Sequence, residues 1–168
     1  MGFAINNGLT CPRRLETVVF PFWFPLYWCL FVLSYFPMRR TRKISVWPVG
    51  LVGDQRYEAP IVKNGKVTGW RVSYDPIRKF ATDMAGFAMN LHLFFEHPDL
   101  QFSHYTRPGS QESDIISKTN ITLNDLEPLA DNCTKVLVWH TRALPPKLTK
   151  EDQMKVKFDH GSNFIVEV

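Results

Sequence analysis

The sequence lacks most of the features that would assign a chemistry by motif alone. Its three cysteines are too few for a disulfide framework, and no Cys-x-x-Cys pair or Cys/His cluster has the spacing of a zinc site. It has no Asp-x-Asp motif, no glycine-rich phosphate loop, no Walker lysine motif and no Gly-x-Ser-x-Gly motif. The net charge of +4 is too weak to indicate nucleic-acid binding. With 168 residues and 45% hydrophobic content, the chain is expected to fold, with room for about one domain.

Charge is almost absent from the first 37 residues, since every charged residue except two arginines and one glutamate lies from Arg39 onward. Residues 18–37 are 20 uncharged residues, about the length that a helix needs to cross roughly 30 Å of hydrocarbon. One interpretation of residues 1–37 is therefore a membrane anchor. Pro21 and Pro25 argue against it, because proline removes helical hydrogen bonds. The alternative is a segment that does not belong to a folded domain.

From residue 38 onward the pattern is that of an α/β domain. Strands are expected at residues 44–49, 56–62, 66–74 and 135–139. Helices are expected at residues 83–96 and 110–118. The dipeptide Asn64-Gly65 favours the positive φ values of a tight hairpin turn between the second and third strands. Apolar residues recur at helical spacing after Asp83, which is the expected N-cap of the longer helix.

Two further signals complete the outline of this domain. Thr122 and Asp125 have the spacing of a capping box, which predicts a turn that ends near Pro128. Residues 143–163 are polar and include Pro145-Pro146, which predicts an extended tail.

Four residues in the middle of the chain are candidates for a binding or catalytic site. Glu112 lies at a loop-to-helix junction, where a carboxylate could act as a general base or could simply be a first-turn residue favoured by the helix dipole. Asp83 could cap the helix with one oxygen and bind a ligand with the other. Arg78 could be a hydrogen-bonding fork for a polar ligand or a solvated loop arginine. Tyr74 could stack on a sugar or pack against its own strand.

Later in the chain, His140 and Arg142 follow an apolar strand, at the end where ligands of α/β sheets collect. A histidine and an arginine suit a phosphate there, and the alternative is an ordinary surface pair. Asn-x-Ser/Thr triplets begin at Asn120 and Asn132. They are candidate glycosylation acceptors and give weak support for a lumenal location.

Several stretches occur together in the order and spacing of one known family. They are VWPVGLVG at residues 46–53, DMAGFA at 83–88, QES at 111–113, LNDLEP at 123–128, and the run from Asn132 to Arg142. The ordered set resembles the carboxyl-terminal half of the animal β-1,3-glucuronosyltransferases, glycosyltransferase family 43. The resemblance extends from Met38 to Val168.

This resemblance implies the carboxyl-terminal, acceptor-binding part of a GT-A glycosyltransferase fold, in a Golgi type II membrane enzyme with a lumenal domain. Such enzymes transfer glucuronic acid from UDP-glucuronic acid, with inversion and with Mn²⁺, to a terminal galactose of a glycoprotein or proteoglycan linker. Glu112 matches the base that takes the proton from the galactose 3-hydroxyl. The other matched positions are Tyr74, Arg78 and Asp83 at the acceptor and His140 and Arg142 at the donor.

In the family, a nucleotide-binding half with an Asp-Asp-Asp metal motif lies upstream of the segment that begins at Trp47. Here residues 1–37 stand in that place, so the predicted domains are an apolar segment, 1–37, and the carboxyl-terminal part of a glucuronosyltransferase domain, 38–168. The predicted function is an acceptor site with its base, without the donor and metal half. The alternative is a catalytically inactive, membrane-anchored module that binds a glycan or forms a homodimer.

Overall fold

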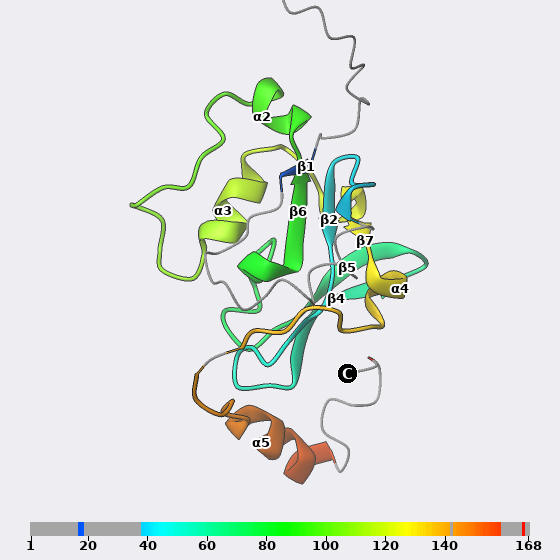
Figure 1. Cartoon of the computed structure of the whole chain (residues 1–168), viewed down its shortest axis with the longest axis vertical. Coiled ribbons are helices and arrows are strands. Elements are labelled where there is room, and N and C mark those ends of the chain that lie inside the picture. The colour runs from blue at the N-terminus through cyan, green and yellow to red at the C-terminus, as the bar shows by residue number, and fades with distance from the viewer. Residues whose placement is uncertain (1–16, 19–37, 142, 159–165, 167–168) are drawn as a thin grey trace, which may run out of the picture.

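The structure is a computed structural model that describes residues 17–18, 38–141, 143–158 and 166. These residues form two small β-sheets with short helices, and the predicted α/β class is confirmed. The elements in chain order (Figure 1) are β1 (Thr17–Val18), β2 (Ile44–Val46), β3 (Val49–Gly50), β4 (Tyr57–Lys63), β5 (Lys66–Arg71), the 3₁₀ helix η1 (Met84–Gly86), β6 (Phe87–Asn90), α2 (His92–Glu96), α3 (Gln111–Ser117), the 3₁₀ helix η2 (Leu123–Asp125), β7 (Glu127–Pro128), α4 (Ala130–Cys133) and α5 (Thr149–Phe158).

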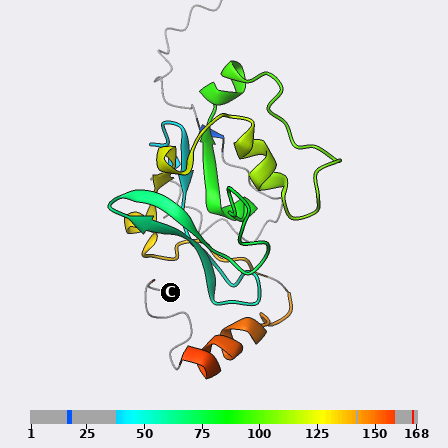
Figure 2. The same cartoon turned by 180° about the vertical axis from the view of Figure 1, so that it is seen from behind.

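The larger sheet has the strand order β1-β6-β2-β7. Strand β6 pairs antiparallel with β1 and with β2, and β7 runs parallel to β2. Every residue of β2 and β6 is buried, and their register places Val46 opposite Phe87 and Ile44 opposite Met89. These side chains share one core with Ile115 of α3, which lies beside β6 in both views (Figures 1 and 2). The core therefore holds α3 against the sheet.

The single helix predicted for residues 83–96 is wrong. The structure divides this segment into η1, β6 and α2. An apolar run that is buried on all sides is compatible with a strand as well as with a helix. Here the run forms a strand, β6, which pairs with both β1 and β2. The predicted capping role of Asp83 is confirmed, because its Oδ1 accepts a 2.8 Å hydrogen bond from the backbone N–H of Ala85 in η1.

The predicted hairpin is confirmed, with β3, β4 and β5 forming the smaller sheet. Asn64 and Gly65 have φ values of 51° and 72°, as a two-residue turn with left-handed geometry requires. Strand β5 ends at Arg71 rather than at residue 74. The strand predicted for 44–49 is interrupted at Trp47 and Pro48, so that its two ends become β2 and β3 in different sheets.

Of the four remaining predictions, two are confirmed and two are wrong. The short helix is confirmed as α3, and Thr122 with Asp125 forms the expected capping box of η2. The strand predicted for 135–139 is wrong, since Trp139 makes only an isolated bridge to Gly50. The extended tail is wrong across α5, whose Glu151 is fully buried. Its backbone N–H donates to the carbonyl of Asp54, a tertiary contact that polar sequence does not reveal.

No helix within the described ranges has both the length and the apolar character needed to cross a bilayer. The predicted anchor, residues 18–37, lies outside the described residues apart from its first position.

The buried strand in place of the predicted helix gives a direct test of the fold. Phe87 and Phe95 lie on the same face of the predicted helix, yet Phe87 of β6 is 1% exposed and Phe95 of α2 is 72% exposed. We expect Phe87→Ala to lower the free energy of unfolding by about 3–5 kcal/mol through lost burial and a residual cavity. The matched change Phe95→Ala should alter it by less than about 0.5 kcal/mol. Urea denaturation measures both, and similar losses at the two positions would contradict the strand.

Candidate functional site

Two predicted site residues, Asp83 and Arg78, are close enough to a third, Glu112, to change its pKa. Burial raises the pKa of the Glu112 carboxyl above its ordinary value, and its own backbone N–H opposes this rise. The negative charge of Asp83 raises the pKa of Glu112 further, whereas the Arg78 guanidinium lowers it. Asp83 and Arg78, up to 34 positions away in the sequence, thus lie within electrostatic reach of Glu112.

Glu112 itself is the second residue of α3. Its Oε2 is buried and has no hydrogen-bond partner in the part of the chain that the structure describes. A buried polar atom without a partner is uncommon in folded proteins, because it loses water without gaining a replacement. An ionised carboxylate only accepts hydrogen bonds, so this oxygen is suited to receive a hydroxyl from a ligand.

Arg78 is fixed by the main chain around it. Its Nε donates to the carbonyl of Asp75 and its Nη2 to that of Tyr74, each at 3.2 Å, and its Nη1 donates to the carbonyl of Gly109. The guanidinium therefore joins the turn of residues 74–78 to the loop that precedes α3. Arg78 is therefore not the solvated loop arginine that the sequence analysis gave as the alternative.

Tyr74 lies over the same loop and is 41% exposed. Its ring is flanked by two guanidinium groups, with the Cζ of Arg78 at 5.2 Å and the Cζ of Arg107 at 5.7 Å from the ring centroid. Arg107 also forms a 3.1 Å ion pair with Asp75. The tyrosine is neither part of β5 nor fully covered, which leaves ring surface for a ligand.

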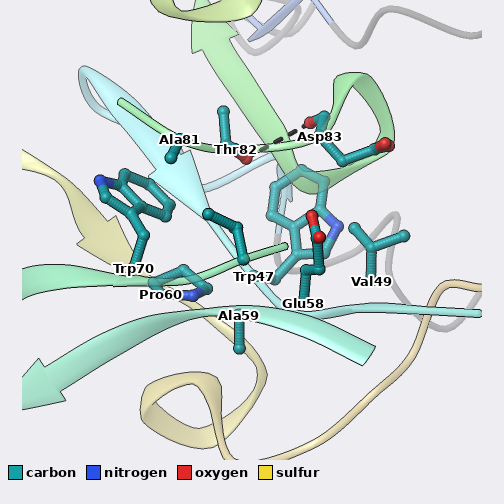
Figure 3. A pocket seen from close by; sticks show the side chains of 10 residues that line it. Trp47, Val49, Glu58, Ala59, Pro60, Trp70, Ala81, Thr82 and Asp83 are labelled. Atoms are coloured by element: carbon teal, nitrogen blue, oxygen red, sulfur yellow. Dashed lines mark hydrogen bonds between the residues drawn. The ribbon is translucent and has the colours of Figure 1, made fainter. Parts of the chain in front are cut away.

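A small pocket of about 10 Å³, room for roughly one water molecule, extends from Asp83. Figure 3 shows Trp70 at one end of this pocket and Asp83 at the other, with Trp47 and Glu58 between them. Glu58 is 8% exposed, and its Oε1 accepts a 2.7 Å hydrogen bond from the backbone N–H of Ser73. Carboxylates that accept hydrogen bonds, placed beside apolar rings, suit a sugar with its hydroxyl groups and apolar C–H faces.

Sequence reasoning missed Glu58. The available signal was a lone carboxylate within the otherwise apolar start of strand β4, between Tyr57 and Ala59. A charged residue is almost never buried without a specific partner or function.

Of the two predicted donor residues, the structure describes His140. His140 is exposed, and its backbone N–H donates to the carbonyl of Gly50 at 2.8 Å. Gly50 must be glycine, because a Cβ there would lie 2.4 Å from Cδ1 of Trp139. No hydrogen bond, ion pair or ring contact among the described residues joins His140 to Glu112. Arg142 lies outside the described residues.

Two other predicted features concern modification and metal binding. Asn120 and Asn132 are both exposed, as a glycosylation acceptor must be. Within the described ranges, no group of three histidine, cysteine or acidic side chains could hold a metal ion.

Acceptor oxygens beside aromatic rings are groups of the kind that contact sugars, and comparison with known proteins points to the class of glycosyltransferases. Residues 31–144 match the model of glycosyltransferase family 43, and the chain belongs to this family. It is 54% identical over 115 residues to galactosylgalactosylxylosylprotein 3-beta-glucuronosyltransferase 2 of Rattus norvegicus, covering 68% of this chain and 35% of that protein. It is 53% identical over 116 residues to galactosylgalactosylxylosylprotein 3-beta-glucuronosyltransferase 1 of Homo sapiens, covering 68% and 34%. The chain thus spans about a third of the length of these relatives.

The raised pKa of Glu112 predicts a defined pH dependence of stability. The folded chain holds the Glu112 proton more tightly than the unfolded chain does, so the free energy of unfolding falls as the pH rises through the folded-state pKa. Glutamine does not ionise. We therefore expect Glu112→Gln to stabilise the chain, relative to the unmodified protein, more at pH 7 than at pH 4.

Urea denaturation at the two pH values measures this difference. Asp99→Asn, at an exposed carboxylate after α2, controls for the general effect of removing a negative charge. An effect of Glu112→Gln that is the same at both pH values would show that burial does not perturb this carboxyl.

Proposed function

We propose that this chain supplies the acceptor site and the general base of an inverting glucuronosyltransferase, within a GT-A fold. The donor is UDP-glucuronic acid, and the acceptor is a terminal galactose of a glycoprotein or of the proteoglycan linker. The observation that carries this proposal is the buried, unpartnered Oε2 of Glu112 beside Asp83. The family membership and the names of the relatives support the same reaction.

Glu112 acts as the base in this proposal. The acceptor 3-hydroxyl gives its proton to Glu112 as its oxygen attacks the anomeric carbon of the glucuronosyl group. A new glycosidic C–O bond forms on the face opposite the leaving group, and the anomeric bond to UDP breaks with its electron pair departing on UDP. A direct attack of this kind needs one base and inverts the configuration. Burial assists Glu112, because a base works best when its pKa is raised toward the working pH.

The other residues hold the acceptor and, at a distance, the donor. Asp83 and Glu58 accept hydrogen bonds from sugar hydroxyls, and the exposed ring surface of Tyr74 packs on an apolar sugar face. Arg78 orients the acceptor through its guanidinium while holding the surrounding loops. His140 and Arg142 contact the donor diphosphate and sugar, as the matched family positions imply.

The family resemblance also implies Mn²⁺, which stabilises the negative charge that develops on UDP as it leaves. The residues that the structure describes do not fit a metal site, since no suitable group of three ligands occurs among them. We therefore assign the metal to the donor-binding half of the enzyme. In this proposal, residues 38–168 form the acceptor part and residues 1–37 form its membrane anchor. The protein is a Golgi membrane protein with a lumenal domain, and Asn120 and Asn132 are its glycosylation sites.

A second candidate function follows from the fact that Glu58, Asp83 and Tyr74 all lie in this one chain. Acceptor binding does not require the donor half, so the chain could bind a galactose-terminated glycan without transfer. Such a membrane-anchored, catalytically inactive module would act alone or as a homodimer.

A chimera tests the proposed function. Residues 38–168 are joined to the donor-binding portion of the Rattus norvegicus relative, and transfer from UDP-glucuronic acid to galactobiose is measured with Mn²⁺. We expect transfer by this chimera, and Glu112→Gln should lower kcat by about 10²- to 10⁴-fold, since glutamine cannot accept the proton.

Two controls make the result specific. UDP affinity should remain unchanged in the Glu112→Gln chimera, which shows that the protein is folded, and Asp99→Asn should leave turnover unchanged. Near-normal turnover of the Glu112→Gln chimera would remove the base assignment. No transfer by a folded, UDP-binding chimera with Glu112 intact would favour the binding module instead.

A further inference from the structure

Tyr74 makes two contacts with the loop of residues 106–110 that sugar stacking does not require. Its hydroxyl donates a 2.9 Å hydrogen bond to the carbonyl of Pro108. Its ring lies so close to Gly109 that an added Cβ would be 2.9 Å from Cε1 of the tyrosine. Gly109 also has a φ of 77°, a left-handed conformation that glycine adopts without strain. The loop is therefore shaped around this one side chain.

The same loop leads directly into α3. The backbone N–H of Gly109 donates to Oε1 of Gln111 at 3.0 Å, and the backbone N–H of Asp114 donates to the carbonyl of Ser110 at 2.9 Å. Only three residues separate Pro108 from Glu112. A displacement of the loop thus passes directly to the first turn of α3 and to its carboxylate.

The exposed ion pair at this point is a weaker tether. Arg107 and Asp75 are 3.1 Å apart, but the arginine side chain is 68% exposed. Ion pairs that are open to solvent contribute little to stability, because water screens them and both side chains lose freedom. The hydroxyl of Tyr74 and its close packing on Gly109 therefore hold the loop together with two further hydrogen bonds, from Arg78 to the carbonyl of Gly109 and from Thr106 to Asp114.

We propose that Tyr74 is a positioning residue for the base: its hydroxyl and ring hold the 106–110 loop and thereby set the place of Glu112. This inference rests on the proposed role of Glu112. Tyr74 is also 41% exposed, so the residue proposed to contact the sugar would also fix the group that deprotonates it. Arg78 joins the same two segments, since it donates to the carbonyls of both Tyr74 and Gly109.

Tyr74→Phe in the full chain separates this role from stacking, because phenylalanine keeps the ring and loses only the hydrogen bond to Pro108. We expect amide hydrogen exchange in residues 106–110 to become about fivefold faster, the effect of losing one net hydrogen bond. The carboxyl of Glu112, followed by NMR with ¹³C-labelled glutamate, should titrate at lower pH. Because the charges of Asp83 and Arg78 remain beside the Glu112 carboxyl, the fall in its pKa would report increased hydration of this group.

Tyr105→Phe is the matched control. Tyr105 lies in the segment between α2 and α3 and is fully exposed, so this variant should match the unmodified chain in both measurements. Gly109→Ala is a second test from the opposite side of the contact. It leaves the tyrosine hydroxyl in place but forces the ring and loop apart, and it should shift the Glu112 titration in the same direction.

The inference is overturned if Tyr74→Phe and Gly109→Ala leave either loop exchange or the Glu112 titration equal to those of Tyr105→Phe. Faster exchange with an unchanged titration would mean that the tyrosine orders the loop without positioning the carboxylate. Neither measurement includes donor or acceptor. A failure here is therefore distinct from a failure of the proposed function, which the Glu112→Gln chimera detects separately.

Discussion

The hydrogen bond between Asp83 and the backbone of Ala85 fixes the start of the segment that leads into the core. This hydrogen bond caps the start of η1. Trp47, directly after β2, holds η1 through two further bonds: its indole N–H donates to the carbonyl of Ala85 at 2.8 Å, and its backbone N–H donates to that of Gly86 at 3.0 Å. Strand β6 begins at the next residue and crosses the core. The capping carboxylate is thereby held at a fixed place on the rim of the pocket.

Glu112 approaches Asp83 from a different element, and the two are held together against their mutual repulsion. Core packing supplies the force, because Ile115 and Ile116 of α3 are both buried among the side chains of β2 and β6. The hydroxyl of Ser113 also accepts a 3.4 Å hydrogen bond from the backbone N–H of Phe80. The scaffold thus keeps a carboxylate partly desolvated, with one oxygen that has no hydrogen-bond partner among the described residues, an arrangement that is unfavourable for stability and useful in a base.

Sequence alone predicted those features that depend on local chemistry. The Asn64-Gly65 turn, the capping box of Thr122 and Asp125, and the cap at Asp83 each follow from a few adjacent residues. It failed where distant contacts decide the structure. The helical spacing after Asp83 gave way to pairing of β6 with two strands, and the polar sequence of α5 concealed the tertiary burial of Glu151.

The candidate site was predicted in the same uneven way. Ordinary residue chemistry left Glu112, Arg78 and Asp83 more consistent with structural roles, and only the family resemblance brought them together as a site. In the structure, Asp83 and Arg78 lie within electrostatic reach of Glu112. Glu58 escaped notice because its burial depends on how β4 packs, whereas the tether between Tyr74 and Pro108 depends on a loop that has no sequence signal.

The central claim is that these residues form an acceptor site within this chain, and sugar binding tests it most directly. The ¹⁵N-labelled full chain is titrated with β-1,3-linked galactobiose, without UDP or Mn²⁺, with cellobiose as the matched disaccharide control. The account predicts saturable NMR shift changes confined to the backbone around Tyr74, Asp83 and Glu112 and to the indole N–H of Trp70, with galactobiose alone. A folded chain that shows no such changes up to about 10 mM galactobiose would contradict this account. The binding free energy would then be weaker than about −3 kcal/mol.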